Sequence, residues 1–186
     1  MNNTILLVDD EQNVLAALKR ALAEEPYRVL TATSGEEGLA LMAEERVKVV
    51  VSDERMPGMA GAEFLTEVRH RHPETVRMML TGHASIEATM KAVNRGEIYR
   101  FFTKPWNEQE LKLTLRGAVE KFDLEEENRR LLKTVKRQSQ ELKALAAKYP
   151  GIADLERDEQ GSIVIDVDED ELEEIIERCN LQYGRP

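Results

Sequence analysis

Apolar runs of strand length alternate with stretches of helical periodicity from residue 3 to about residue 120. Strands are predicted where mainly apolar residues follow one another, at Thr4–Val8, Tyr27–Thr31, Val47–Ser52, Val76–Leu80 and Ile98–Phe102. Helices are predicted where apolar residues recur every three or four positions, at Glu11–Glu24, from the N-cap Ser34 through Met42, at Gly61–His70, at Ser85–Asn94 and from about Asn107. This alternation predicts an α/β fold with five parallel strands in a doubly wound sheet.

Polar side chains follow four of these predicted strands. Asp9 and Asp10 come after the first strand, Asp53 after the third, Thr81 after the fourth and Lys104 after the fifth. In doubly wound sheets, ligands bind beyond the carboxyl ends of the strands, because these ends share one edge of the sheet. Three carboxylates, one hydroxyl and one ammonium group are therefore expected to meet at that edge.

This set of side chains favours phosphoryl chemistry. Neighbouring carboxylates raise each other's pKa unless a cation lies among them, and Mg²⁺ is a hard cation that prefers carboxylate oxygens. Asp53 is the candidate nucleophile that would form an acyl phosphate, while Lys104 and Mg²⁺ neutralise charge and Thr81 donates a hydrogen bond. Each residue alone is explained by a turn or a helix cap. Their order along one sheet edge favours a shared site instead.

The motifs LLVDDE, SDERMPGMAG, LTG and FFTKPW resemble those of the response-regulator receiver domain of two-component signalling. The resemblance covers about residues 3–120, so residues 1–120 are expected to form a flavodoxin-like receiver domain. It implies that a histidine kinase or a phosphotransfer protein phosphorylates Asp53. It also implies a Mg²⁺ site whose ligands are Asp9, Asp10, Asp53 and the backbone carbonyl of Arg55.

The same resemblance implies a role for three residues in switching. Thr81 would be the switch hydroxyl, and Lys104 would be the lysine that pairs with the phosphoryl group. Phe101, three residues before that lysine, stands where the family has its switch aromatic residue. Because the usual tyrosine hydroxyl is absent there, switching at Phe101 would depend on ring packing alone.

Two further positions tune the phosphoryl lifetime in receivers, and here they hold Arg55 and His83. We expect both side chains to screen Asp53 from attacking water; the alternative for His83 is a solvent-facing loop histidine.

The stretch VNRGEIYRFFTKPWN also resembles receivers that feed cyclic-di-GMP phosphodiesterase (HD-GYP) domains or activator ATPase modules. The 186 residues are too few to include either output.

A helical extension is predicted at 121–148, since neither proline nor glycine interrupts the chain there. Its apolar residues keep an a/d heptad register with two polar members, at Leu124, Asn128, Leu131, Val135, Gln138, Leu142 and Leu145. This register predicts a parallel homodimeric coiled coil through Leu124–Leu145, in which paired Asn128 side chains fix the alignment. The alternative is an amphipathic helix that folds back on its own domain.

An acidic tail follows at 149–186, after Tyr149-Pro150-Gly151 ends the helix. The tail holds most of the net charge of −10 and reads as a small ββα, that is α+β, module. A module of this size does not hold itself firmly, so we expect it to dock on another chain or on a protein effector. Its sequence resembles no family that we identify.

Composition narrows the function further. Nothing resembles a basic patch for nucleic-acid phosphates, so no DNA partner is expected. The single cysteine, Cys179, excludes an intrachain disulfide, and no apolar run reaches the length of a membrane span, so we expect a cytoplasmic protein without membrane contact. The predicted function is a phosphorylation switch acting through protein–protein contacts, and not an enzyme beyond its own phosphorylation and dephosphorylation. The alternatives are a phosphate sink for a kinase, or a truncated regulator whose enzymatic output is missing.

Overall fold

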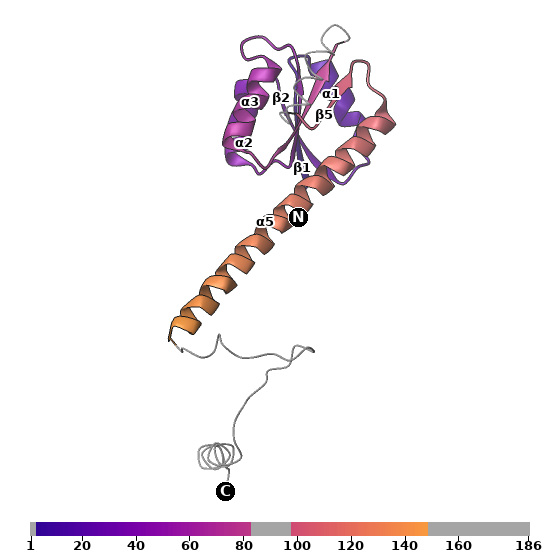
Figure 1. Ribbon diagram of the computed structural model, residues 1–186. Coiled ribbons are helices and arrows are strands. Elements are labelled where there is room, and N and C mark those ends of the chain that lie inside the picture. Colours follow the sequence, from indigo (N-terminus) through magenta and orange to yellow (C-terminus); the bar gives the residue numbers. More distant parts are fainter. Residues whose placement is uncertain (1–2, 83–97, 149–186) are drawn as a thin grey trace, which may run out of the picture. The chain divides into compact units, whose positions relative to one another are not determined.

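The computed structural model describes residues 3–82 and 98–148, and its elements follow the predicted order (Figure 1). These elements are β1 (Asn3–Val8), α1 (Gln12–Ala21), β2 (Tyr27–Ala32), α2 (Gly35–Glu44), β3 (Val49–Asp53), α3 (Gly61–Arg71), β4 (Val76–Thr81), β5 (Arg100–Thr103) and α5 (Glu108–Lys148). The helix predicted at Ser85–Asn94, the residue His83 and the tail at 149–186 lie outside the described residues.

The strands form one five-stranded parallel sheet in the order β2-β1-β3-β4-β5. The register pairs Ile5 of β1 with Val49 of β3, and Val51 of β3 with Met78 of β4. All of β3 and most of β1 and β4 are buried, and strands buried on both faces are the ones that read as continuous apolar runs. The doubly wound, flavodoxin-like α/β fold predicted from the sequence is confirmed.

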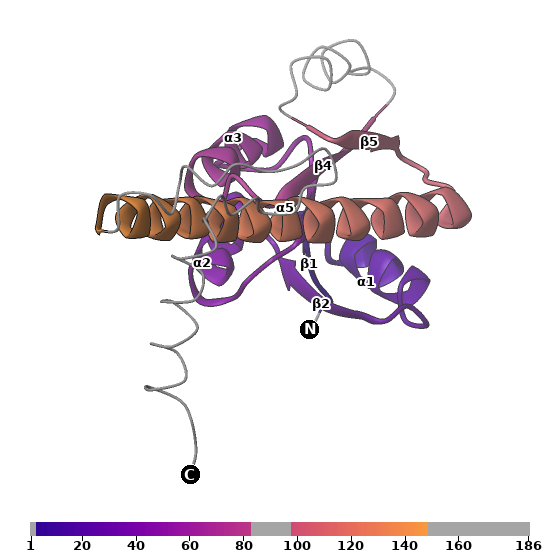
Figure 2. The same ribbon diagram turned by 60° about the horizontal axis from the view of Figure 1, so that its bottom comes forward.

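Two hydrophobic clusters cover the opposite faces of the sheet, and successive residues of β1 divide between them because side chains of a strand alternate. Ile5 and Leu7 belong to the first cluster, with residues of α1 and α5. Leu6 and Val8 belong to the second cluster, with residues of α2 and α3. Figures 1 and 2 agree in showing α2 and α3 on one side of the sheet and α1 on the other.

The amino-terminal ends of the strands, here called the amino edge, hold α5 through charged side chains. Lys48, just before β3, is 7% exposed; its Nζ lies 2.8 Å from Asn3 Oδ1 and 2.5 Å from Asp123 Oδ1 of α5. The cations of Lys48 and Arg46 lie 5.7 and 5.4 Å from the centre of the Phe122 ring. Such cation–π contacts, with an ion pair whose lysine is buried, attach α5 to this edge of the sheet.

Two more ion pairs support this attachment. Arg116 of α5 donates to both carboxylate oxygens of Glu25, in the loop before β2, at 3.1 and 2.9 Å. Arg46 forms an ion pair with Glu126, which is one turn beyond Phe122 on α5. The attachment of α5 to the amino edge is therefore distributed over several contacts along the helix.

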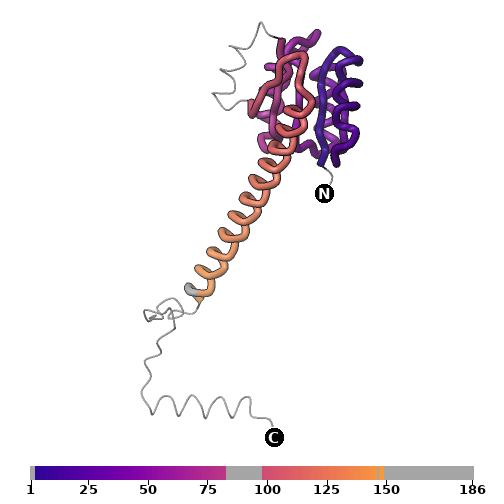
Figure 3. The backbone as a smooth tube through the Cα atoms, turned by 90° about the vertical axis from the view of Figure 1, so that its right-hand side faces the viewer, coloured from indigo at the N-terminus to yellow at the C-terminus, as the bar shows by residue number. Residues whose placement is uncertain are grey.

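α5 is a single uninterrupted helix from Glu108 to Lys148, so the long helix predicted after the sheet is confirmed (Figure 3). The chain divides into two compact units within this helix, Met1–Leu131 and Leu132–Pro186. The apolar members of the predicted heptad register are 48% to 67% exposed, namely Leu124, Leu131, Val135, Leu142 and Leu145. In the parts of the chain that the structure describes, no helix is both long and apolar enough to cross a membrane.

Candidate functional site

The opposite edge of the sheet, here called the carboxyl edge, brings together four of the residues singled out in the sequence. Asp9 follows β1 and is fully buried; Asp53 ends β3 and is 7% exposed. Thr81 ends β4 and is fully buried, while Lys104 directly follows β5. The strand register causes this convergence, because Asp53 pairs with Leu80 and Thr81 pairs with Thr103.

Lys104 lies between the two buried carboxylates. Its Nζ is 2.8 Å from Asp9 Oδ2 and 2.5 Å from Asp53 Oδ1. Burial by itself lowers the pKa of the Lys104 ammonium, but the hydrogen bonds to Asp53 and Asp9 outweigh burial and raise that pKa overall. Burial also raises the pKa of the Asp9 carboxyl, against the opposing hydrogen bond from Lys104. One ammonium group thus neutralises part of the charge of two acids.

The main chain holds the other oxygen of each carboxylate. The N–H of Glu11 donates to Asp9 Oδ1 at 2.9 Å, and the N–H of Arg55 donates to Asp53 Oδ2 at 2.8 Å. In both cases the donor lies two residues after the acid, as expected for an aspartate that begins a turn. Each carboxylate is therefore oriented by one backbone N–H and one shared cation.

The backbone of Asp53 is also closely approached by Gly61, the first residue of α3. A Cβ atom added to Gly61 would lie 1.9 Å from the carbonyl oxygen of Asp53, so only glycine allows α3 to begin at this point. The N–H of Gly61 donates to the carbonyl oxygen of Glu54 at 3.0 Å. Sequence reasoning missed this role, although Gly61 ends the motif SDERMPGMAG, because its contact with Asp53 depends on the loop geometry.

A second residue that sequence reasoning missed is Glu54, which directly follows Asp53. The hydroxyl of Thr81 lies 2.7 Å from Glu54 Oε2 and 3.0 Å from the carbonyl oxygen of Gly82. Thr81 therefore lies at the carboxyl edge, and its hydroxyl is directed to a carboxylate that had no predicted role. The only signal for Glu54 in the sequence is its position next to Asp53.

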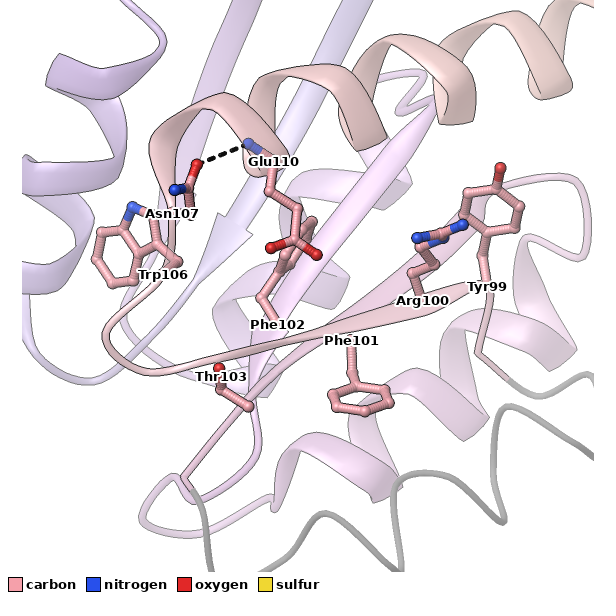
Figure 4. Close-up of a pocket in the computed structure, with 8 residues that line it drawn as sticks. All are labelled: Tyr99, Arg100, Phe101, Phe102, Thr103, Trp106, Asn107 and Glu110. Carbon is pink, nitrogen blue, oxygen red and sulfur yellow. Dashed lines mark hydrogen bonds between the residues drawn. The ribbon is translucent and has the colours of Figure 1, made fainter.

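Phe101 and Phe102 lie on opposite faces of β5, with Phe102 directed toward α5 (Figure 4). Phe102 is buried in the first hydrophobic cluster, and Phe101 is half-buried against the second. Phe101, Phe102 and Trp106 are among the residues that line a cavity of about 550 Å³ between β5 and the start of α5. Phe101 thus lies half-buried on the face of β5 that points away from α5.

The contacts described above do not involve the side chains of three other predicted site residues. Asp10 and Arg55 are exposed, and His83 lies outside the described residues. Asp9, Asp10 and Asp53 offer the hard oxygen donors that suit Mg²⁺, and the shared ammonium shows that Asp9 and Asp53 can hold one cation between them. Within 3–82 and 98–148, however, no group of three or more acidic, histidine or cysteine side chains is arranged to hold a metal. The donor chemistry fits Mg²⁺, although the ligands are not gathered around a single point.

Comparisons with known proteins concern the same part of the chain. The family model of the response regulator receiver domain matches residues 5–116. The hydrogenase transcriptional regulatory protein HoxA of Cupriavidus necator is 44% identical over 128 residues, which make up 69% of this chain and 26% of HoxA. The nitrogen assimilation regulatory protein NtrX of Azorhizobium caulinodans is 33% identical over 133 residues, or 70% of this chain and 29% of NtrX. The chain thus spans less than a third of the length of these curated relatives.

A solved structure extends the likeness to the fold. The signal receiver domain of an HD domain-containing protein from Pseudomonas fluorescens is 37% identical, with a TM-score of 0.63. The match covers 66% of this chain and 98% of that domain. The similarity therefore extends over nearly the whole of that receiver domain.

Proposed function

Because the chain belongs to the response regulator receiver domain family, we propose that it is a phosphorylation-dependent switch in two-component signalling. A histidine kinase or a phosphotransfer protein would supply the phosphoryl group, and Asp53 would accept it. Support comes from the ammonium group of Lys104, which lies 2.5 Å from Asp53 and also pairs with Asp9. A cation shared by two acids at the ends of buried strands is suited to follow negative charge onto a phosphoryl group.

In this reaction, a carboxylate oxygen of Asp53 attacks the phosphorus of a phosphohistidine, so that a P–O bond forms and the P–N bond breaks. The released histidine keeps the electron pair of the broken bond and takes up a proton from water. Lys104 exchanges its carboxylate partner for an oxygen of the transferred group and neutralises its charge. When bound by Asp9, Asp10, Asp53 and the Arg55 carbonyl, Mg²⁺ supplies further positive charge at the same point.

Thr81 and Phe101 would convert the new charge into a change of shape. Thr81 lies at the end of β4, one strand from Asp53, so its hydroxyl can turn to donate to the phosphoryl group. Phe101 on β5 would then repack, since its ring is half-buried against the second hydrophobic cluster. Arg55, with His83, would screen the acyl phosphate from water and prolong its lifetime.

The output would be a protein–protein contact made by a dimer. Five of the exposed apolar residues of α5 follow a heptad register from Leu124 to Leu145, which favours a parallel coiled coil between two copies of the chain. The acidic tail at 149–186 would bind a protein effector, and its negative charge disfavours DNA. A phosphate sink, the rival function, needs no such register on the helix.

The decisive test compares wild-type protein with Asp53→Ala after incubation with acetyl phosphate and Mg²⁺, using intact-mass spectrometry to detect the phosphoryl group. We expect one phosphoryl group on the wild type and none on Asp53→Ala. The matched control is Asp123→Asn, which removes an acid that pairs with a lysine at the amino edge. Equal labelling of the wild type and Asp53→Ala, or loss of labelling in Asp123→Asn alone, would contradict the assignment.

Light scattering after size exclusion tests the dimer separately. We expect a dimer for the wild type and a monomer when Leu131 and Val135 are both replaced by lysine, because charges at seam positions oppose coiled-coil pairing. A monomeric wild type, both with and without phosphorylation, would remove the coiled coil from the proposal. Signalling that survives removal of 121–186 would favour the phosphate sink.

A further inference from the structure

The hydroxyl of Thr81 is already engaged at the carboxyl edge. Its oxygen lies 2.7 Å from Glu54 Oε2 and 3.0 Å from the carbonyl oxygen of Gly82, and Thr81 is fully buried. A hydroxyl group has one proton, so it donates to one of these two oxygens at a time. Both oxygens belong to residues other than Asp53, the proposed phosphoacceptor.

Glu54 is held firmly in the place from which it reaches this hydroxyl. Its N–H donates to the carbonyl oxygen of Leu80 at 3.0 Å, one residue before Thr81. Its own carbonyl oxygen accepts from the N–H of Gly61 at 3.0 Å. The main chain of Glu54 is thus fixed between β4 and the start of α3, and the carboxylate is kept beside Thr81.

We propose that Glu54 is a positioning residue that holds the Thr81 hydroxyl in the unphosphorylated protein and so opposes the switch. This inference rests on the function proposed above, since it concerns the same phosphoryl site. For Thr81 to donate to a phosphoryl oxygen, its hydrogen bond to Glu54 must break. A hydrogen bond to an ionised carboxylate is stronger than one between neutral groups, so Glu54 shifts the equilibrium toward the resting state.

The size of this effect follows from the usual strength of such bonds. A hydrogen bond to a charged partner changes an equilibrium by about tenfold or somewhat more. Glu54→Ala should therefore tighten the binding of beryllofluoride, which mimics the acyl phosphate, by about tenfold. Glu54→Gln keeps an oxygen that accepts from Thr81 but lacks the charge, so its affinity should lie between those of the wild type and Glu54→Ala.

Simple charge repulsion is the competing explanation, because removing any carboxylate near the site favours an incoming anion. A double-mutant cycle separates the two. If Glu54 acts through the hydroxyl, Glu54→Ala has an effect of less than about twofold when Thr81 is already alanine. If repulsion alone operates, the effect is the same in both backgrounds.

The experiment titrates beryllofluoride in excess Mg²⁺ and follows the fluorescence of Trp106, the only tryptophan, two residues after Lys104. The proteins are the full chain with Glu54→Ala, Glu54→Gln, Thr81→Ala and the double substitution, each checked for folding by thermal unfolding. The matched control is Glu36→Ala, which removes an exposed acid whose carboxylate approaches Gly58 in the neighbouring β3–α3 loop. We expect this control to change the affinity by less than about twofold.

The outcomes separate this inference from the function on which it rests. Tightening by Glu54→Ala that disappears in the Thr81→Ala background supports the role of Glu54. Equal tightening in both backgrounds, equal tightening by Glu36→Ala, or no tightening overturns it and leaves the phosphoryl switch in place. A wild type that responds no more than Asp53→Ala would overturn the proposed function, and the role of Glu54 with it.

Discussion

The two edges of the sheet each contain a lysine that pairs with aspartate, but the two lysines differ in what they connect. At the carboxyl edge, Lys104 contacts Asp9 and Asp53, which follow or end two different strands. At the amino edge, Lys48 connects the start of β3 to Asp123 of α5. The side chain of Lys104 is 25% exposed, whereas that of Lys48 is 7% exposed and covered by the Phe122 ring.

This difference indicates how a lysine–aspartate pair can have a different role at each edge of the sheet. The ammonium of Lys104 faces two acids at an open edge, so it has an alternative partner when either acid changes its charge. Lys48 has one acid and one amide, and a helix closes over it, so its bonds stabilise the fold. In the proposed function, position at the carboxyl or the amino end of a strand would therefore distinguish a lysine that takes part in chemistry from one that anchors a helix.

The largest expected effect comes from Lys104→Met. Removing the cation that meets the transferred group should slow phosphorylation of Asp53 by about hundredfold, as for the loss of other groups that stabilise developing charge. The initial rate with acetyl phosphate in excess Mg²⁺, read by intact-mass spectrometry, measures this. Lys48→Met is the matched control and should leave the rate within about twofold. Equal losses in the two variants would remove the distinction between the edges.

The second-largest effect is expected on the free energy of unfolding, when Gly61 is replaced by alanine. Because a Cβ atom there would lie 1.9 Å from the Asp53 carbonyl oxygen, Gly61→Ala should lower the free energy of unfolding by about 3 kcal/mol. Gly117 of α5 is the matched control, since a Cβ atom there meets nothing nearer than the Tyr99 hydroxyl at 3.8 Å. Gly117→Ala should raise stability by about 0.5–1 kcal/mol, because alanine favours a helix interior. Urea unfolding measures both, and a tolerated Gly61→Ala would contradict the close approach.

The pattern of apolar and polar residues predicted most of the fold and part of this site. Buried parallel strands are continuous apolar runs, so strand ends were visible in the sequence, and with them the meeting of Asp9, Asp53 and Lys104. Contacts that depend on side-chain direction were not visible. Lys48 is the one charged residue in an apolar run. The pattern alone does not reveal that Asp123, 75 positions later, accepts a hydrogen bond from its ammonium group. The bond between Glu54 and Thr81 likewise required the register of β3 and β4.

The third effect concerns the amino edge itself. Lys48→Met removes the hydrogen bonds to Asn3 and Asp123, and both acceptors remain close to water, so the loss is that of ordinary hydrogen bonds. We expect the free energy of unfolding to fall by about 1–2 kcal/mol, measured by urea unfolding. Lys19→Met, which removes an exposed lysine of α1, should change it by less than about 0.5 kcal/mol. A stability equal to that of the wild type would mean that the other contacts of α5 hold the helix without Lys48.

The smallest effect is expected at the ion pair between Glu25 and Arg116, and it depends on pH. The hydrogen bond from Arg116 holds the pKa of the Glu25 carboxyl below its ordinary value of 4.5. Stability from a lowered carboxyl pKa is present above that ordinary value and is lost as the pH falls through the pKa of the folded state. Glu25→Gln should therefore be less stable than the wild type at pH 7, and the two should converge in acid.

Urea unfolding of both proteins at pH 7 and at successively lower pH measures this convergence. Glu24→Gln is the matched control, because Glu24 is an exposed acid one position earlier and changes the net charge equally. A gap between wild type and Glu25→Gln that persists in acid would show that Glu25 acts by packing and not by charge. If the two stabilities converge in acid, the Glu25–Arg116 ion pair acts by charge. Like the Lys48–Asp123 pair, it is then a contact of the amino edge that holds α5. The acids of the carboxyl edge would then be the ones whose charge is available for chemistry.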